Sequence, residues 1–393
     1  MARRIIYWFR NDLRLNDNEA LFTASDVSEE IVPVFVFDPR QFENTRLGFR
    51  RTSALRAQFL IDCVTDLRNR LREKGGDLLI RIGEPEKIIA QLADAYGAEY
   101  VYTSKEIGPE ETRIESSLSK NLKTGNVDIR LFWMDTLVHA LDLPFPIAKL
   151  PTDFHSFYEG IKDNLKVKGP FPEPESIRLP QEFDAGHIPS LPALGIDPAE
   201  IRSDIAKQKA EPRGESQALL AFAAYLNESA PLPTEQPLIE TGLSEWLSLG
   251  CLSPAYIFHY IQEIEASDKK EAMLYDLLKR DYFHLILLRY GPRLFKPSGV
   301  KHEFTKRWTN DRDVFEKWVN AQTENNEVNE TIEKLKIKGS LNSAERMLAA
   351  AYLVNVLGVN WTWGAMFFES NLKDYEVSVS WGKWNNLAGV GLE

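Results

Sequence analysis

The chain has 393 residues, of which 44% are hydrophobic and 27% charged, and its formal net charge at pH 7 is −11. This length predicts two or three domains. The acidic balance argues against strong nonspecific binding to nucleic acid, because affinity for phosphates comes from clustered cations. Two cysteines, Cys63 and Cys251, imply no disulfide framework and fit a reducing compartment, so we expect a cytoplasmic protein.

The sequence also excludes several kinds of site. It contains no zinc or iron–sulfur spacing, so we expect no metal. No apolar run approaches the ~18 residues that span a membrane, and no secretory pattern opens the chain. We therefore expect no membrane partner.

Residues 1–133 alternate between short apolar runs and amphipathic stretches. The expected strands are Ile5–Phe9, Ile31–Phe37, Leu78–Ile82, Tyr100–Thr103 and Ile129–Trp133. Regular alternation of strand and helix predicts a doubly wound parallel sheet. Such sheets bind ligands at the carboxyl ends of their strands, so the charged loop after Phe9 is a candidate site. In that loop, Asp17 stands where a helix cap is expected.

The rest of the chain divides into a connector, residues 134–213, and a helical region, residues 214–393. Eleven of the 21 prolines lie within residues 141–212. Proline is disfavoured in helix interiors and in central strands, which indicates a long surface connector. From Glu215 onward the apolar residues follow helical spacing with few β-branched runs, which predicts an all-α domain.

The loop after the first strand carries a long recognisable pattern. Residues 8–21 read W-F-R-N-D-L-R-L-N-D-N-E-A-L, which resembles the amino-terminal signature of the photolyase and cryptochrome family. Glu19 is similar to the DASH cryptochrome branch in particular. The resemblance implies the photolyase/cryptochrome fold: an α/β antenna-type domain with a doubly wound parallel sheet, then a connector, then an all-α domain of the FAD-binding type.

Three tryptophans match the family's electron relay to its flavin: Trp384, Trp361 and Trp308. Indole is oxidisable and extended, so indoles in series can pass an electron from the surface to a buried excited flavin. Six of the nine tryptophans lie after residue 300. The alternative is therefore that these are ordinary core aromatics of a helical domain.

The resemblance also implies a set of FAD-binding positions. They are Thr241, Ser244, Asp276, Arg280, Ser343, Arg346, Asp374, Glu376 and Ser380. Hydroxyls at a helix start favour a phosphate, although plain helix capping by Thr241 or Ser244 is the alternative. Arg346 and Asp374 are expected to pair, either beside the flavin or as a purely structural ion pair. Ser343, Glu376 and Ser380 replace other residue types of the family, which predicts weaker binding of FAD.

Two further positions concern damaged DNA. Lys279 and Asn386 stand where the family keeps the aromatic faces that hold a flipped pyrimidine dimer. Stacking supplies roughly 1–3 kcal/mol per base, so these replacements predict little dimer repair. The resemblance also implies an antenna cofactor, 5,10-methenyltetrahydrofolate, with Glu110 or Glu111 at the position that contacts it in relatives. A solvated helix start is the alternative explanation for those two glutamates.

We therefore expect a blue-light flavoprotein of the DASH cryptochrome type, in which FAD is photoreduced through the tryptophans. Its role would be that of a photoreceptor or redox protein, with a signalling partner that the sequence does not identify and weak contact at most with single-stranded or damaged DNA. One alternative is a deoxyribodipyrimidine photolyase, a carbon–carbon lyase, that repairs UV-damaged single-stranded DNA. The other is a degenerate family member that binds no flavin and acts as an interaction scaffold.

Overall fold

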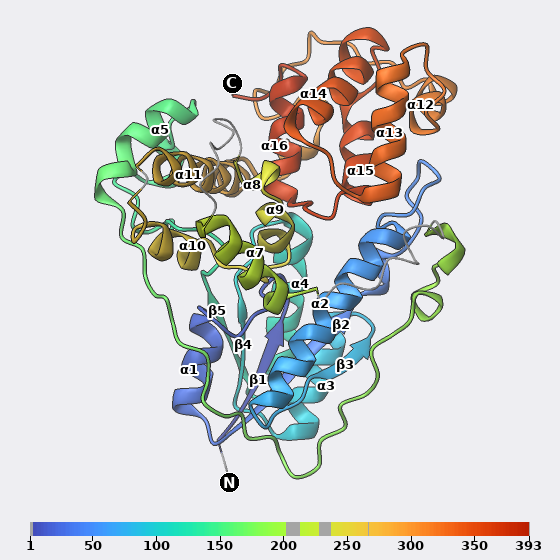
Figure 1. Cartoon of the computed structure of the whole chain (residues 1–393). Helices are drawn as coiled ribbons and strands as arrows, with labels where there is room; N and C mark the ends of the chain where they lie inside the picture. The colour runs from blue at the N-terminus through green and yellow to red at the C-terminus, as the bar shows by residue number, and fades with distance from the viewer. Residues whose placement is uncertain (1–2, 202–212, 228–236, 266, 393) are drawn as a thin grey trace.

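The computed structural model describes residues 3–201, 213–227, 237–265 and 267–392. An α/β domain lies at one end of the molecule and a helical domain at the other (Figure 1). The strands are β1 (Arg4–Phe9), β2 (Glu30–Phe37), β3 (Leu79–Ile82), β4 (Tyr100–Ser104) and β5 (Asp128–Phe132). They form one five-stranded parallel sheet in the order β3-β2-β1-β4-β5. The expected doubly wound parallel sheet is thus confirmed, with every strand within one residue of its expected ends.

Alternate side chains of β1 supply the cores on the two faces of the sheet, as the pleat of a strand requires. Ile5, Tyr7 and Phe9 join a core that continues into the helical domain. Ile6 and Trp8 join a smaller core on the opposite face. The helices of this domain are α1 (Glu19–Val27), α2 (Ala54–Glu73), α3 (Pro85–Tyr96) and α4 (Pro109–Lys123). Burial on both faces explains why β1 is an uninterrupted apolar run.

The loop after β1 is held in a different way from the one expected. Asn18, and not Asp17, caps α1, because the Asn18 side chain accepts a hydrogen bond of 2.9 Å from the backbone N–H of Leu21. Asp17 has a positive φ of 49°. Its carboxylate accepts hydrogen bonds from the Phe171 backbone N–H, at 3.0 Å, and from the Ser253 hydroxyl. The prediction of Asp17 as a cap was wrong because its side chain ties the loop to the connector and to α10 (Pro254–Ile261).

The proline-rich segment contains one helix, α5 (Phe154–Ile161), and the short helical turns η2 (Ile147–Lys149), η3 (Lys162–Asn164), η4 (Leu191–Leu194) and η5 (Pro198–Glu200). Asp153 caps α5 through the backbone N–H of Ser156. The helix packs on α11 of the helical domain, where the rings of Phe157 and Tyr282 are 5.2 Å apart (Figure 1). Part of the expected connector, residues 202–212, lies outside the described residues.

The helical domain is organised around α11 (Ser267–Tyr290), which contacts α16, α5, α8 and α10. Its other elements are α7 (Glu215–Asn227), α8 (Pro237–Glu240), α9 (Leu243–Ser248), η6 (Gly291–Phe295), α12 (Arg312–Val319), α13 (Asn326–Lys338), α14 (Ser343–Ala351), the π-helical η7 (Tyr352–Val356), α15 (Trp361–Asn371) and α16 (Val377–Leu387). Among the helices that the structure describes, none is both long and apolar enough to cross a membrane.

Candidate functional site

A cavity of about 660 Å³ lies between the two domains. The loops at the carboxyl ends of β1, β2 and β4 form one wall, and residues of α11 and α15, with those at the start of α16, form the other. Many of the lining side chains are charged, including Arg10, Glu106, Arg280 and Glu376. The position agrees with the general rule that doubly wound sheets bind ligands beyond the carboxyl ends of their strands.

Both predicted antenna residues lie on the wall of this cavity. Glu110 pairs with Arg51 at 2.7 Å. The Glu111 carboxylate lies against Gly108, where a Cβ atom would collide with it, and burial raises the pKa of Glu111. Burial also raises the pKa of the neighbouring Glu106 to about 7, against the opposing effect of Arg10. The wall therefore offers carboxyl groups that can accept, or when protonated donate, hydrogen bonds to a polar ring.

Four other residues that line the cavity form an ion-pair group that we call the Asp135 cluster: Asp135, Arg280, His284 and Glu376. The Arg280 guanidinium contacts Asp135 Oδ1 at 2.5 Å and Glu376 Oε2 at 2.8 Å. His284 Nε2 lies 2.9 Å from Asp135 Oδ2. Asp135 follows β5, whereas Arg280 and His284 belong to α11 and Glu376 directly precedes α16. The cluster therefore joins the α/β domain to the helical domain.

The charges of this cluster stabilise one another. Burial opposes ionisation of Asp135, but Arg280 and His284 hold the pKa of Asp135 well below its usual range. Burial would likewise lower the pKa of His284, yet the Asp135 carboxylate raises it above the ordinary value. Arg280 and Glu376 were predicted from the sequence. Asp135 and His284 were not, although a polar residue just after a parallel strand and a histidine four residues after Arg280 on one helix face were available signals.

A second group links Ser244, Arg346 and Asp374. Arg346 Nη2 donates to Asp374 Oδ2 at 2.7 Å, and the Ser244 hydroxyl donates to the same oxygen at 2.9 Å. The expected Arg346–Asp374 pair is thus formed. Gly242 is the N-cap residue of α9 and no side chain caps this helix. The capping alternative for Thr241 and Ser244 is therefore wrong, and Ser244 instead orients the aspartate.

Two buried polar atoms, one in this second group and one at the predicted FAD-binding position Ser343, have no hydrogen-bond partner among the described residues. Among the described residues, the Ser343 hydroxyl and Asp374 Oδ1 are buried and make no hydrogen bond. Leaving a buried polar group unpaired costs about 1–3 kcal/mol, so such atoms indicate a missing ligand. Because they lie at predicted FAD-binding positions, the residues present fit a flavin nucleotide. Ser380, also predicted, is half-buried on α16, four residues before Trp384.

A lysine that sequence reasoning missed accompanies these groups. Burial lowers the pKa of Lys383 on α16 to about 8, against the opposing effect of Asp276. Asp276 is itself buried, and its carboxylate accepts a 3.0 Å hydrogen bond from the backbone N–H of Leu238. Burial raises the pKa of Asp276. The sequence gives no clear signal for this role of Lys383, because its neighbours on the same face of α16 include Ser380 and Asn386.

The three predicted relay tryptophans differ in burial. Trp384 is 3% exposed and Trp361 is fully buried, whereas Trp308 is half-buried. Trp384 packs on α15 at Gly364, where a Cβ atom would collide with the indole. The indole N–H groups of Trp361 and Trp308 both donate to the carbonyl oxygen of Pro297, at 3.1 and 3.2 Å. Trp361 and Trp308 thus connect the core to a half-buried position, and Trp384 lies in the core.

The two lesion-site positions lie in different surroundings. The Lys279 ammonium lies 5.6 Å from the ring centre of Phe154 and 5.9 Å from that of Tyr275. Tyr275 is 41% exposed. The Asn386 side chain lies against Gly391 in the turn after α16. Neither position presents an aromatic face of its own.

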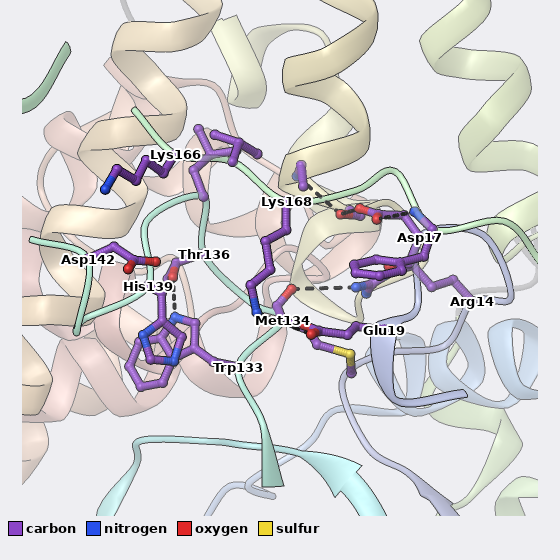
Figure 2. Close-up of a pocket in the computed structure, with 15 residues that line it drawn as sticks. Arg14, Asp17, Glu19, Trp133, Met134, Thr136, His139, Asp142, Lys166 and Lys168 are labelled. Carbon is purple, nitrogen blue, oxygen red and sulfur yellow. Dashed lines mark hydrogen bonds and ion pairs between the residues drawn. The ribbon is translucent and has the colours of Figure 1, made fainter. Parts of the chain in front are cut away.

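A second hollow, of about 50 Å³, lies where the connector crosses the loop after β1. Figure 2 shows Arg14, Asp17 and Lys168 around it, with the Trp133 indole hydrogen-bonded to Thr136 at 2.6 Å. This volume admits little more than one or two waters. We assign it to the anchoring of the connector. Within the part of the chain that the structure describes, no group of acidic, histidine and cysteine side chains is arranged to hold a metal ion.

Comparison with known proteins agrees with these geometric findings. Residues 5–175 match the family model described as DNA photolyase, and residues 273–393 match the model described as the FAD binding domain of DNA photolyase. A cryptochrome DASH of Gloeobacter violaceus is 35% identical over 99% of this chain and 80% of its own length. A chloroplastic/mitochondrial cryptochrome DASH of Arabidopsis thaliana is 34% identical over 98% of this chain and 70% of its own length.

Solved structures show the same likeness. The crystal structure of a Synechocystis cryptochrome superposes with a TM-score of 0.90 at 31% identity, covering 99% of this chain and 82% of that one. A class III photolyase of Agrobacterium tumefaciens, at 21% identity, shares the fold with a TM-score of 0.85, over 100% of this chain and 80% of its own. The chain therefore belongs to the photolyase/cryptochrome family, as a DASH-like flavoprotein with a FAD-binding domain.

Proposed function

We propose that the protein uses blue light to reduce bound FAD through Trp384, Trp361 and Trp308, acts as a photoreceptor or redox protein, and repairs few pyrimidine dimers. The observation that carries this proposal is that the buried Trp361 and the half-buried Trp308 donate to the same carbonyl oxygen of Pro297, while Trp384 is also enclosed in the core. Ordinary core aromatics need no such link to a half-buried position.

Different residues of the chain bind the cofactor, transfer the electron and hold the two domains together. Ser244 and Arg346 orient Asp374, whose second oxygen, with the Ser343 hydroxyl, is left to bind the cofactor. When bound, FAD supplies blue-light absorption and a one-electron acceptor. Trp384 gives the first electron. Trp361 then reduces the oxidised Trp384, and Trp308 reduces the oxidised Trp361. The Asp135 cluster keeps the helices of this site fixed against the α/β domain.

The test has two steps. Titration of the purified protein with FAD, followed by flavin fluorescence, should show saturable binding. Blue light with a thiol reductant should then bleach the oxidised flavin band, and Trp384→Phe should abolish this bleaching because phenylalanine is much harder to oxidise. Trp133→Phe, in the α/β domain, is the matched control and should bleach like the wild type. Absence of saturable binding would favour the scaffold alternative, and unchanged bleaching in Trp384→Phe would make that residue a packing residue only.

We further propose that the interdomain cavity binds 5,10-methenyltetrahydrofolate as an antenna. Its volume of about 660 Å³ lies within the range of about 300–1,000 Å³ that is usual for cofactor sites, and the carboxyl groups of Glu106 and Glu111 suit a pterin ring. Added folate should acquire protein-dependent absorption, and Glu111→Gln should weaken its binding. Equal binding by the variant would remove Glu111 from the site.

Contact with DNA is proposed to be weak. The ammonium of Lys279 and the exposed ring of Tyr275 offer one cation and one stacking face, which suits single-stranded better than duplex DNA. The photolyase alternative requires two aromatic faces at the positions of Lys279 and Asn386, so it is less well supported. Dimer-containing single strands should bind weakly and remain unrepaired under blue light.

We also propose a cytoplasmic location, because both cysteines are free and buried, as in proteins of reducing compartments. Cell fractionation with an antibody to the protein tests this. Recovery of the protein with an organelle would contradict it.

A further inference from the structure

The middle tryptophan of the proposed relay touches a second aromatic pair. The ring centres of Trp361 and Trp381 are 5.7 Å apart, with their planes inclined by 73°. Trp381 is 6% exposed, and its indole N–H donates a 3.0 Å hydrogen bond to the Tyr375 hydroxyl oxygen. Trp361, Trp381 and Tyr375 therefore form a continuous series of contacts that leaves the relay at its midpoint.

This series ends at the interdomain cavity, because Tyr375 is half-buried and lines it. The Arg56 guanidinium carbon lies 4.7 Å from the centre of the Tyr375 ring. Burial, followed by the nearby Glu369, raises the pKa of Tyr375 well above its ordinary value. The phenol is thus protonated at neutral pH, and its ring lies at the boundary between a dry aromatic core and a cavity that small molecules can enter.

We propose that Trp381 and Tyr375 form a second branch of the electron relay, which supplies electrons to Trp361 from the interdomain cavity. The inference rests on the proposed function, because it begins when light-driven electron transfer has oxidised Trp384 and then Trp361. The proposed relay of three tryptophans ends at the half-buried Trp308. The new branch ends instead where a small reductant has access to Tyr375.

The electrons and protons balance in three steps. Oxidised Trp361 takes one electron from Trp381, which becomes an indole radical cation with its N–H intact. Trp381 then takes one electron from Tyr375, and Tyr375 releases its hydroxyl proton to solvent in the cavity, which leaves a neutral tyrosyl radical. A thiol that enters the cavity transfers one hydrogen atom to the tyrosyl oxygen. Tyrosine is restored and a thiyl radical departs.

Electrostatics favours Tyr375 over Trp308 as the residue that remains oxidised. The Lys306 ammonium lies 6.0 Å from the Trp308 ring centre, so a positive charge on Trp308 is repelled. An oxidised tyrosine has lost its proton and is neutral, so Arg56 does not oppose it in the same way. The oxidised site should therefore settle on Tyr375.

The experiment identifies the radical by its type. FAD-loaded protein is illuminated by a light flash without thiol, and the product is examined by electron paramagnetic resonance and transient absorption. We expect a tyrosyl radical in the wild type and in Trp308→Phe, and only tryptophan radicals in Tyr375→Phe and Trp381→Phe. Tyr100→Phe is the matched control, because Tyr100 is half-buried with the Arg130 guanidinium carbon 4.8 Å from its ring centre. This control should keep the tyrosyl signal.

A second readout uses the rate of flavin bleaching with thiol present. Trp308→Phe should still bleach, whereas Trp308→Phe combined with Tyr375→Phe should lose bleaching as completely as Trp384→Phe does. A wild type that bleaches but shows only tryptophan radicals, or a tyrosyl signal that survives in Tyr375→Phe, would overturn the branch while leaving the proposed function intact. If light produced no radical at all in the wild type, both would fall.

Discussion

Arg280 of the Asp135 cluster and Lys279 are neighbours on the same helix, α11, yet their surroundings are built very differently. Arg280 is buried and contacts two carboxylates from two other segments of the chain. Lys279, its neighbour in sequence, is half-buried with its ammonium about as far from two aromatic rings as a weak cation–π contact allows. The comparison shows that Arg280 is held by several charged groups, whereas the ammonium of Lys279 has distant contacts with aromatic rings.

The largest effect is expected from breaking the Asp135 cluster. Arg280→Met leaves the largely buried carboxylate of Glu376 and the half-buried carboxylate of Asp135 without their guanidinium, and should lower the free energy of unfolding by about 3–5 kcal/mol. Urea denaturation measures this. The exposed Arg307→Met is the control and should stay within about 0.5 kcal/mol of the wild type. Equal stabilities of the two variants would mean that the cluster contributes little to the fold.

Asp281, the residue after Arg280, is a second buried group of α11 and predicts a pH dependence of stability. Burial raises the pKa of Asp281 to about 7, far above its unfolded value of about 3.9. As pH rises from about 4 to 7, the unfolded state loses this proton before the folded state does, so stability falls by roughly 2–4 kcal/mol and stays lower above that range.

Asp281→Asn removes this titration but keeps an oxygen that can accept the hydrogen bond from the Val138 backbone N–H. The difference in stability between variant and wild type should therefore grow in favour of the variant from pH 4 to 7. The exposed Asp313→Asn should show no such trend. A constant difference for Asp281→Asn across this range would show that its carboxyl group is not held protonated.

The surroundings of Lys279 can be tested by adding an aromatic face at that position. Lys279→Trp adds one stacking face, worth about 1–3 kcal/mol, which should raise affinity for a dimer-containing single strand by about 5- to 150-fold. Fluorescence anisotropy with a labelled oligonucleotide measures this. Lys301→Trp, at an exposed lysine elsewhere in the helical domain, is the control. Equal gains in both variants would mean that position 279 does not face the bound strand.

The smallest effect is expected at Ser343. Its hydroxyl makes no hydrogen bond within the described residues, so Ser343→Ala should not destabilise the protein free of FAD. If the hydroxyl binds FAD, the variant should lose about 1 kcal/mol of binding free energy, or about fivefold in Kd. FAD titration together with urea denaturation separates the two quantities. A loss of stability without a loss of affinity would make Ser343 a structural residue.

The fold was readable from the sequence because its signals are local. The five strands are apolar runs of β-rich residues, and each ends within one residue of its expected position. The loop after β1 shows where local signals fail. Asp17 and Asn18 are both good caps, and only the positive φ of Asp17 and its contact with distant Ser253 decide between them.

The candidate site was readable only where a family pattern marked it. The Arg346–Asp374 pair was expected and is formed, while its role in holding FAD remains a prediction. Asp135 was missed because it meets Arg280 across 145 positions of sequence, and no periodicity links a residue after β5 to a helix of another domain. Tyr375 and Lys383 were missed for the same reason, since their surroundings come from packing.

The central claim is that the protein keeps light-driven reduction of FAD while it has lost dimer repair. One measurement tests both halves: FAD-loaded protein is illuminated with blue light, without oxygen, in the presence of a thiol and a dimer-containing single-stranded oligonucleotide. We predict that the oxidised flavin band disappears while the dimers remain intact. Repeated repair of dimers by each protein molecule, or a flavin band unchanged by light, would contradict the account.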